Sequence, residues 1–158
     1  MSQNLDLLLK LASSNIDDIR SAARTLAKLR AFAAVPRLVE LLNHEDEALR
    51  LSIMEALGHI GDPNSLEPLA NALGDRQPKI RIGAAMAIAN LGLKDVVELL
   101  ERPMHSDSSI DVRCACARAL GVVGTAEAVD VLVAALVNSD EVLLACISEV
   151  LGGLGYSF

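Results

Sequence analysis

The chain has 158 residues, of which 52% are hydrophobic and 2% aromatic, and its formal net charge is −7. This hydrophobic content is enough for a continuous core and excludes a disordered chain, while the abundance of Leu and Ala favours closely packed helices over a β-sheet. The negative charge argues against nucleic acids and anionic membranes as partners, because both require a basic surface. No apolar stretch reaches the roughly 18–20 uninterrupted residues of a membrane span, and residues 1–10 lack a signal-peptide pattern, so we expect a cytoplasmic protein.

Short apolar helices are predicted to alternate with longer amphipathic helices along the chain. The short helices are predicted at residues 5–11, 34–42, 66–73, 96–100 and 128–137. Turns rich in Asp, Asn and Ser follow them at residues 13–18, 43–46, 75–78, 104–111 and 138–140. Pro36 and Pro68 fall in the first turns of their helices, where a missing N–H breaks no hydrogen bond. Each unit is therefore predicted to be helix, turn, helix.

The longer helices repeat around one anchor position, which recurs every 30 to 32 residues as Arg20, Arg50, Arg81, Arg113 and finally Leu144. Apolar residues at −1, +3, +6, +7 and +10 from the anchor form one helical face, and glycine at +11 ends the helix in four of the five units. The repeats are expected at about residues 3–31, 34–61, 65–93, 95–124 and 126–155. A single unit cannot bury its apolar faces, so we expect one domain of stacked repeats.

Two segments carry a family resemblance, Val35-Pro36-Arg37-Leu38 to Gly61 and Leu66-Glu67-Pro68-Leu69 to Gly92. They resemble HEAT repeats of the short bacterial and archaeal kind that is also found in phycobilisome lyase subunits. The resemblance spans nearly the whole chain and implies an all-α, armadillo-like α-solenoid of about five helix-turn-helix repeats. It identifies the fold better than the function, because the repeat occurs in scaffolds, chaperone-like lyases and a few enzymes.

The four anchor arginines form a regular arginine ladder. In the resembled repeat this arginine pairs with an aspartate of the turn before it, in its own or a neighbouring unit, so the expected partners are Asp17, Asp46 and Asp111. Bidentate pairs of this kind fix geometry, and we therefore interpret the ladder as structural. Acidic residues also gather in the turns before the longer helices, where carboxylates cap helix N-termini.

Histidine and cysteine patterns predict no metal site. The dipeptide His44-Glu45 is similar to the iron-binding pairs of deoxyhypusine hydroxylases, which are HEAT-like, but it occurs once and in a turn. His59 and His105 have no partner at ligand spacing. The sequence also lacks a Ser/His/Asp pattern and a phosphate-binding loop, so we expect no cofactor and no enzymatic activity.

Three cysteines, Cys114, Cys116 and Cys146, are an odd number without metal-ligand spacing. Cys114 and Cys116 are two residues apart on a predicted helix, which turns their side chains about 200° away from each other. They can share neither a zinc ion nor a disulfide. Free, reduced thiols are therefore expected.

The longer helices are expected to line the concave side of the solenoid, with positions +1, +4, +5 and +8 facing outward. Apolar side chains there would mark a binding surface, and small residues at +8 would let a partner helix approach. The alternatives are a helix phase that is wrong by one residue, or a concave side curved too tightly to expose these side chains. The predicted partner-binding residues are Leu51, Met54, Glu55, Ile82, Met86, Cys114 and Arg118.

The last repeat lacks the polar outer face that a terminal repeat ordinarily has. Its anchor is Leu144, and the helix over residues 142–151 has only Ser148 and Glu149 as polar residues. We therefore expect another chain to cover this end, with Leu144 in the contact. A second copy across a two-fold axis is favoured over a different partner.

The sequence predicts a binding surface but shows no catalytic or metal-binding pattern. It therefore favours a non-catalytic protein-interaction module or scaffold that binds a partner protein through its concave face. The family resemblance leaves one alternative open. This is a bilin lyase-type or phycobilisome-associated subunit that binds a tetrapyrrole or its carrier protein.

Overall fold

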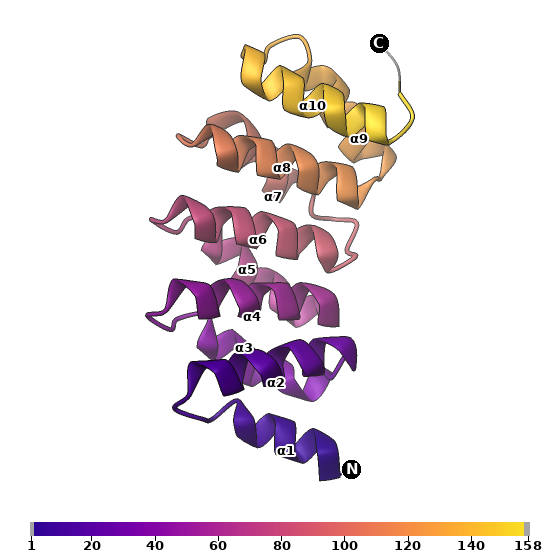
Figure 1. Ribbon diagram of the computed structural model, residues 1–158. Helices are drawn as coiled ribbons and strands as arrows, with labels where there is room; N and C mark the ends of the chain where they lie inside the picture. Colours follow the sequence, from indigo (N-terminus) through magenta and orange to yellow (C-terminus); the bar gives the residue numbers. More distant parts are fainter. Residues whose placement is uncertain (1, 157–158) are drawn as a thin grey trace.

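The computed structural model describes residues 2–156, with the side chains of residues 4–156, and this part of the chain contains helices and no strand. Figure 1 shows the helices stacked one repeat above another, with the two termini at opposite ends. The predicted all-α solenoid is confirmed. Its helices are α1 (Ser2–Lys10), α2 (Ile16–Lys28), α3 (Val35–Leu41), α4 (Glu47–Ile60), α5 (Leu66–Ala72), α6 (Pro78–Asn90), α7 (Val97–Ser106), α8 (Ile110–Val123), α9 (Ala126–Ala135) and α10 (Glu141–Gly153), and short 3-10 turns at Phe32–Ala34 and Pro63–Ser65 precede α3 and α5.

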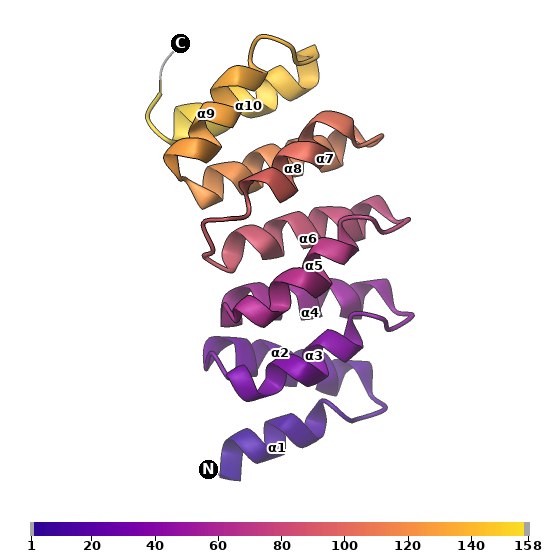
Figure 2. The ribbon, with the colours of Figure 1, turned by 180° about the vertical axis from the view of Figure 1, so that it is seen from behind.

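The helices form two layers. The even-helix layer, made of α2, α4, α6, α8 and α10, faces the viewer in Figure 1, and α3, α5, α7 and α9 face the viewer from the opposite side in Figure 2. The core lies between the layers, where Leu49, Ile53 and Leu57 of α4 are fully buried at the predicted apolar positions. The repeating apolar face is therefore what holds the two layers together.

Caps set the ends of the even helices. The side chains of Asp46 and Asp140 accept hydrogen bonds from the backbone N–H of Leu49 and Leu143, which fixes the starts of α4 and α10. Gly61 ends α4 in the left-handed region with a φ of 75°, a conformation that glycine adopts without strain.

Neighbouring even helices approach closely where a small residue lies between them. A β-carbon on Gly58 of α4 would lie 3.0 Å from the backbone oxygen of Ala87 in α6, and one on Gly121 of α8 would clash with Val150 of α10. These glycines, which the sequence suggested as an approach for a partner helix, instead accommodate the next helix of the same chain.

Three of the four arginines in the ladder join consecutive repeats through aspartates of the following turn. Arg50 contacts Asp75 at 2.5 Å, Arg81 contacts Asp107 at 2.8 Å, and Arg113 contacts Asp140 at 2.6 Å. Arg50 and Arg113 also donate from Nε to the backbone oxygens of Leu42 and Met104 in their own repeats. Each of these arginines thus links its own turn to the next one.

The predicted ladder partners Asp17, Asp46 and Asp111 are wrong. Asp46 caps α4, and neither Asp17 nor Asp111 forms an ion pair with any described residue. The physical reason is direction: the anchor side chain extends toward the next repeat, so its carboxylate partner lies about 25 residues further along the chain.

Cys114 of α8 and Cys146 of α10 form a disulfide, with 5.8 Å between their Cα atoms. The expectation of free thiols is wrong for this pair, because the divergence of side chains on one helix separates Cys114 from Cys116 but not from Cys146. The 32 residues between them are close to one repeat, so they meet on neighbouring even helices. Cys116 is free, and burial raises the pKa of its thiol to about 12.

A membrane span requires a helix that is both long and apolar. Within residues 2–156, no helix combines the length and the apolar composition that a span requires.

Candidate functional site

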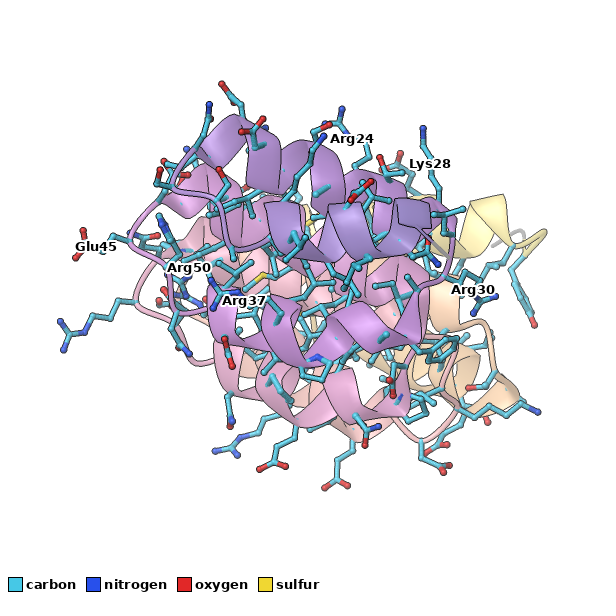
Figure 3. All side chains as sticks on the ribbon, turned by 90° about the horizontal axis from the view of Figure 1, so that it is seen from below. Arg24, Lys28, Arg30, Arg37, Glu45 and Arg50 are labelled. Carbon is cyan, nitrogen blue, oxygen red and sulfur yellow. A yellow bond between two sulfur atoms is a disulfide. The ribbon has the colours of Figure 1, made fainter. Side chains whose placement is uncertain are left out.

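A cleft of about 480 Å³ lies on the even-helix layer between α2 and α4. Figure 3 shows Arg24 and Lys28 projecting outward along one edge of the molecule, with Arg30 at the same end as Lys28. We call this the α2–α4 cleft. It is lined by Arg20, Arg24, Ala27, Lys28, Arg30, Ser52, Glu55, Ala56 and His59.

The cationic wall of the cleft follows from helical spacing. Arg20, Arg24 and Lys28 are four residues apart on α2, so their side chains share one face of the helix. They occupy the anchor, +4 and +8 positions, which face the next even helix. In the three following repeats the residues at +4 and +8 are small or apolar and at least half-buried: Met54 and Gly58, Ala85 and Ala89, Ala117 and Gly121.

The first seam between even helices therefore differs from those that follow. A β-carbon on Gly83 would lie 3.3 Å from the Sδ atom of Met54, so α6 packs directly onto α4. Arg24 and Lys28, by contrast, are exposed. Two long charged side chains replace an apolar contact, and the groove between α2 and α4 stays open to solvent.

Arg30 closes one end of the cleft. It lies beyond the end of α2 and is the one residue other than glycine, among those described, that has a positive φ, at 47°. Its Nε donates to the backbone oxygen of Ile60 at 3.3 Å, and a β-carbon on Gly61 would lie 2.8 Å from its Nη2. The guanidinium therefore lies over the last turn of α4, beside Gly61.

The α4 wall supplies polar groups. Ser52 accepts a hydrogen bond from Nε of Arg20 at 3.1 Å. Nδ1 of His59 lies 2.8 Å from the backbone oxygen of Glu55. Because a carbonyl oxygen only accepts, Nδ1 carries the proton in this contact, and Nε2 is left able to accept one. Glu55 is the single carboxylate among the lining residues.

The charge of the cleft is opposite to that of the chain. Arg20, Arg24, Lys28 and Arg30 place four cations around it, against one carboxylate, in a chain whose net charge is −7. Within the described residues none of these four forms an ion pair. The arrangement can bind an anion. The spacing of Arg20, Arg24 and Lys28 is the signal in the sequence that could have predicted this cleft.

The structure separates the predicted partner-binding residues into three groups. Glu55 and Arg118 are exposed, while Leu51, Ile82 and Met86 are half-buried. Met54 and Cys114 are buried, so the expectation that they face outward is wrong. The neighbouring even helix covers position +4, and the disulfide turns Cys114 toward α10. Whether the remaining residues bind a partner stays a prediction.

Met86 and Arg118 do come together, at a second hollow of about 320 Å³ on the even-helix layer. This hollow has a mostly apolar lining and lies between α6, α8 and α10. The other residues that line it are Gly121, Val122, Val150, Gly153 and Leu154.

A third hollow, of about 810 Å³, lies beside the turns before α6 and α8. Its polar groups include Arg81 and Asp107, which already bind each other at 2.8 Å. It is therefore a weaker candidate for a ligand than the α2–α4 cleft. Nδ1 of His44 accepts a hydrogen bond from the backbone N–H of Asp46. Among residues 4–156 there is no group of three or more His, Cys, Asp or Glu that could hold a metal.

Comparisons with known proteins support the fold and correct the function. A family model described as HEAT repeats matches residues 5–77 and 66–152. The chain is 37% identical over 102 residues to the bilin biosynthesis protein PecE of Mastigocladus laminosus, covering 64% of this chain and 38% of that protein. It is 32% identical over 100 residues to the phycocyanin alpha phycocyanobilin lyase CpcF of a Synechocystis species, covering 63% and 46%. The chain thus spans less than half the length of these two relatives.

Among solved structures, the chain matches the complex of CpcE and CpcF of phycocyanin lyase from Nostoc sp. PCC7120, with a TM-score of 0.73 and 21% identity. The match covers 95% of this chain and 98% of the matched one. At this identity the match shows the fold alone.

The expectation of a non-catalytic interaction module, and with it the expectation that the chain is not an enzyme, is wrong in the light of these relatives. PecE is named for bilin biosynthesis and CpcF is named as a lyase. They agree with the alternative that the sequence left open. The repeat pattern did not predict the function, because solenoids with the same repeats carry different functional surfaces.

Proposed function

We propose a function from the premise that the chain belongs to the HEAT-repeat family: it is a bilin lyase-type subunit that binds a tetrapyrrole or the protein that carries one. The observation that carries this proposal is the 37% identity to PecE over 64% of the chain. Because the match covers 38% of PecE, the chain would supply one part of the activity.

The surface chemistry of the even-helix layer is consistent with this role. A tetrapyrrole is an extended apolar ring system with carboxylate side chains, and a small-molecule site typically combines apolar walls with a few placed polar groups in a volume of about 300–1,000 Å³. The α2–α4 cleft has about 480 Å³ and contributes cations, with Ala27 and Ala56 among its walls. The hollow between α6, α8 and α10 contributes apolar surface.

A protein partner is proposed at the C-terminal end. Val137 and Val142 are 83% and 56% exposed, and Leu144 is 36% exposed, so this end of the solenoid presents apolar side chains to solvent. The structural match is to a complex of two chains, CpcE and CpcF. We infer that another HEAT-repeat chain covers this end, and the second copy expected from the sequence stays a prediction.

The function is tested by adding the purified chain to phycocyanobilin and recording the visible absorption and circular dichroism spectra. Binding fixes the bilin in one chiral conformation, so we expect a shifted absorption maximum and an induced dichroism that saturates with added protein. A parallel measurement tests capture of the apo form of a phycobiliprotein by the immobilised chain. An unchanged bilin spectrum together with no capture would contradict the proposal.

A further inference from the structure

The α2–α4 cleft is the one seam of the even-helix layer where the packing positions carry charge. The equivalent positions between α4 and α6 hold Met54 and Gly58, which are buried. Arg24 and Lys28 in their place give up that apolar contact and leave both side chains exposed. Packing between repeats does not explain why charged residues replace small or apolar ones at these two positions. Binding of an anionic ligand would explain it.

The backbone at Arg30 points to the same place. A residue other than glycine at a φ of 47° is strained, and the equivalent end of α4 has Gly61 in the left-handed region. This backbone conformation places the Arg30 guanidinium across the end of the cleft, where it contacts the last turn of α4. Strained residues of this kind cluster at functional sites.

The cations are available to a ligand. Arg20 is partly engaged by Ser52 through its Nε, and Arg30 donates its Nε to a backbone oxygen, which holds both guanidinium groups in place with further N–H groups to offer. Arg24 and Lys28 make neither an ion pair nor a side-chain hydrogen bond with any described residue. Four donors of fixed positive charge around one groove are suited to carboxylates.

The spacing of the cations indicates more than one carboxylate. Four residues of α-helix advance about 6 Å, so Arg24 and Lys28 present two charges separated by about that distance on one helix face. A linear tetrapyrrole carries two propionate side chains on its two central rings, each ending in a carboxylate. The two carboxylates match two neighbouring cations better than a single anion would.

We propose that the α2–α4 cleft binds the two propionate carboxylates of a linear tetrapyrrole, with Arg24 and Lys28 as the primary contacts and Arg30 closing the end of the site. The inference rests on the proposed function and adds to it the place and the chemical group that is recognised.

The test compares phycocyanobilin, which has both carboxylates, with its dimethyl ester, which has none. Dissociation constants are measured from the spectral change for the wild-type chain, for the double variant Arg24→Glu/Lys28→Glu and for Arg30→Gln. The matched control is Arg76→Glu/Lys94→Glu, which makes the same change in net charge at two exposed cations without an ion pair among the described residues. Far-ultraviolet dichroism and melting temperature check that each variant is folded.

We expect the wild-type chain to bind the diacid about 10- to 100-fold more tightly than the ester, the factor expected for hydrogen bonds to charged groups. Arg24→Glu/Lys28→Glu should remove this preference while ester binding is retained, Arg30→Gln should reduce it, and the control should keep it. The preference should also weaken as salt is raised.

Equal binding of diacid and ester, or an unchanged preference in Arg24→Glu/Lys28→Glu, overturns this inference while the proposed function stands. Binding of neither form overturns the inference together with tetrapyrrole binding. Oligoglutamate serves as a second probe: if it binds to the wild-type chain, depends on Arg24 and Lys28 and is not displaced by phycocyanobilin, the cleft recognises an acidic protein segment and the inference is wrong.

Discussion

Arg81 donates two hydrogen bonds to the carboxylate of Asp107, from Nε and from Nη2, each at 2.8 Å. The two side chains are 11% and 9% exposed, so this pair is the most buried step of the arginine ladder. It connects the start of α6 to the turn before α8. The relationship makes Arg81 a test of whether the ladder stabilises the stack.

Replacement of Arg81 by Ala should lower the free energy of unfolding by about 1–3 kcal/mol, because it leaves the buried Asp107 carboxylate without its partner. Urea denaturation followed by circular dichroism measures the change. The control is Lys79→Ala, which removes an exposed pair with Glu47 and should change stability by less than about 1 kcal/mol. Equal effects of the two substitutions would contradict a structural role for the ladder.

Acidic pH should weaken the ladder. Burial of Asp107 raises the pKa of its carboxyl, but the hydrogen bonds from Arg81 and from the backbone of Ser109 outweigh burial and hold the pKa below its ordinary value. The pKa of Asp75 is lowered in the same way by Arg50 and Gln77 against burial. Because these pKa values are lower in the folded state, their contribution is complete above the unfolded value of about 4 and is lost as the pH falls through the folded value.

Unfolding measured between about pH 6 and pH 2 should therefore show stability falling below pH 4 to 5. The variant Asp107→Asn, which cannot titrate, should be less stable at neutral pH and should lose less on acidification than the wild type. Parallel curves for the two proteins would show that Asp107 does not contribute to the pH dependence.

The cysteines give a direct chemical prediction. In the folded, oxidised protein Cys114 and Cys146 are joined and Cys116 is buried with a pKa of about 12, so a thiol reagent such as DTNB should react with none of them rapidly at neutral pH. One thiol should react after denaturation and three after reduction. Fast reaction of two thiols in the native, unreduced protein would show that the disulfide is absent.

Loss of the disulfide should lower stability by about 2–4 kcal/mol, because the cross-link restricts the unfolded chain. The double variant Cys114→Ala/Cys146→Ala tests this by urea denaturation. Its matched control is the wild type with and without reductant, which should show the same difference. A variant as stable as the oxidised wild type would contradict the expected contribution.

The apolar C-terminal end predicts self-association. Multi-angle light scattering at tens of micromolar, where a weak dimer is populated, should report a dimer for the wild-type chain. Leu144→Glu places a charge at a 36% exposed position and should shift the population to monomer without unfolding it. A monodisperse wild-type monomer would exclude the homodimer and leave a different chain as the partner for this end.

The repeat period predicted the core well, because burial at each apolar position depends on a helix phase that five repeats specify together. Leu49, Ile80, Val112 and Leu143 stand directly before the anchor and are all fully buried. The same period could not predict which repeat an anchor arginine reaches. A turn aspartate stands on each side of Arg50, Asp46 before it and Asp75 25 residues after it, and only the direction of stacking decides between them.

The candidate site was harder to predict because it depends on contacts between repeats. Met54 and Arg24 occupy the same position in consecutive units, yet Met54 is buried and Arg24 is exposed. Burial there is set by what the neighbouring even helix presents, such as Gly83 opposite Met54. A helical wheel treats each helix alone and cannot supply this information.

Arg30 has a left-handed backbone conformation. Selection for stability and selection for ligand affinity would therefore favour different residues at this position. Arg30→Gly would relieve roughly 1–2 kcal/mol of backbone strain and would also remove the cation that lies over Gly61. A library screened only for heat resistance should therefore enrich glycine at position 30, and one screened for retained bilin should restore arginine. Position 30 would then trade backbone strain against a contact to the ligand.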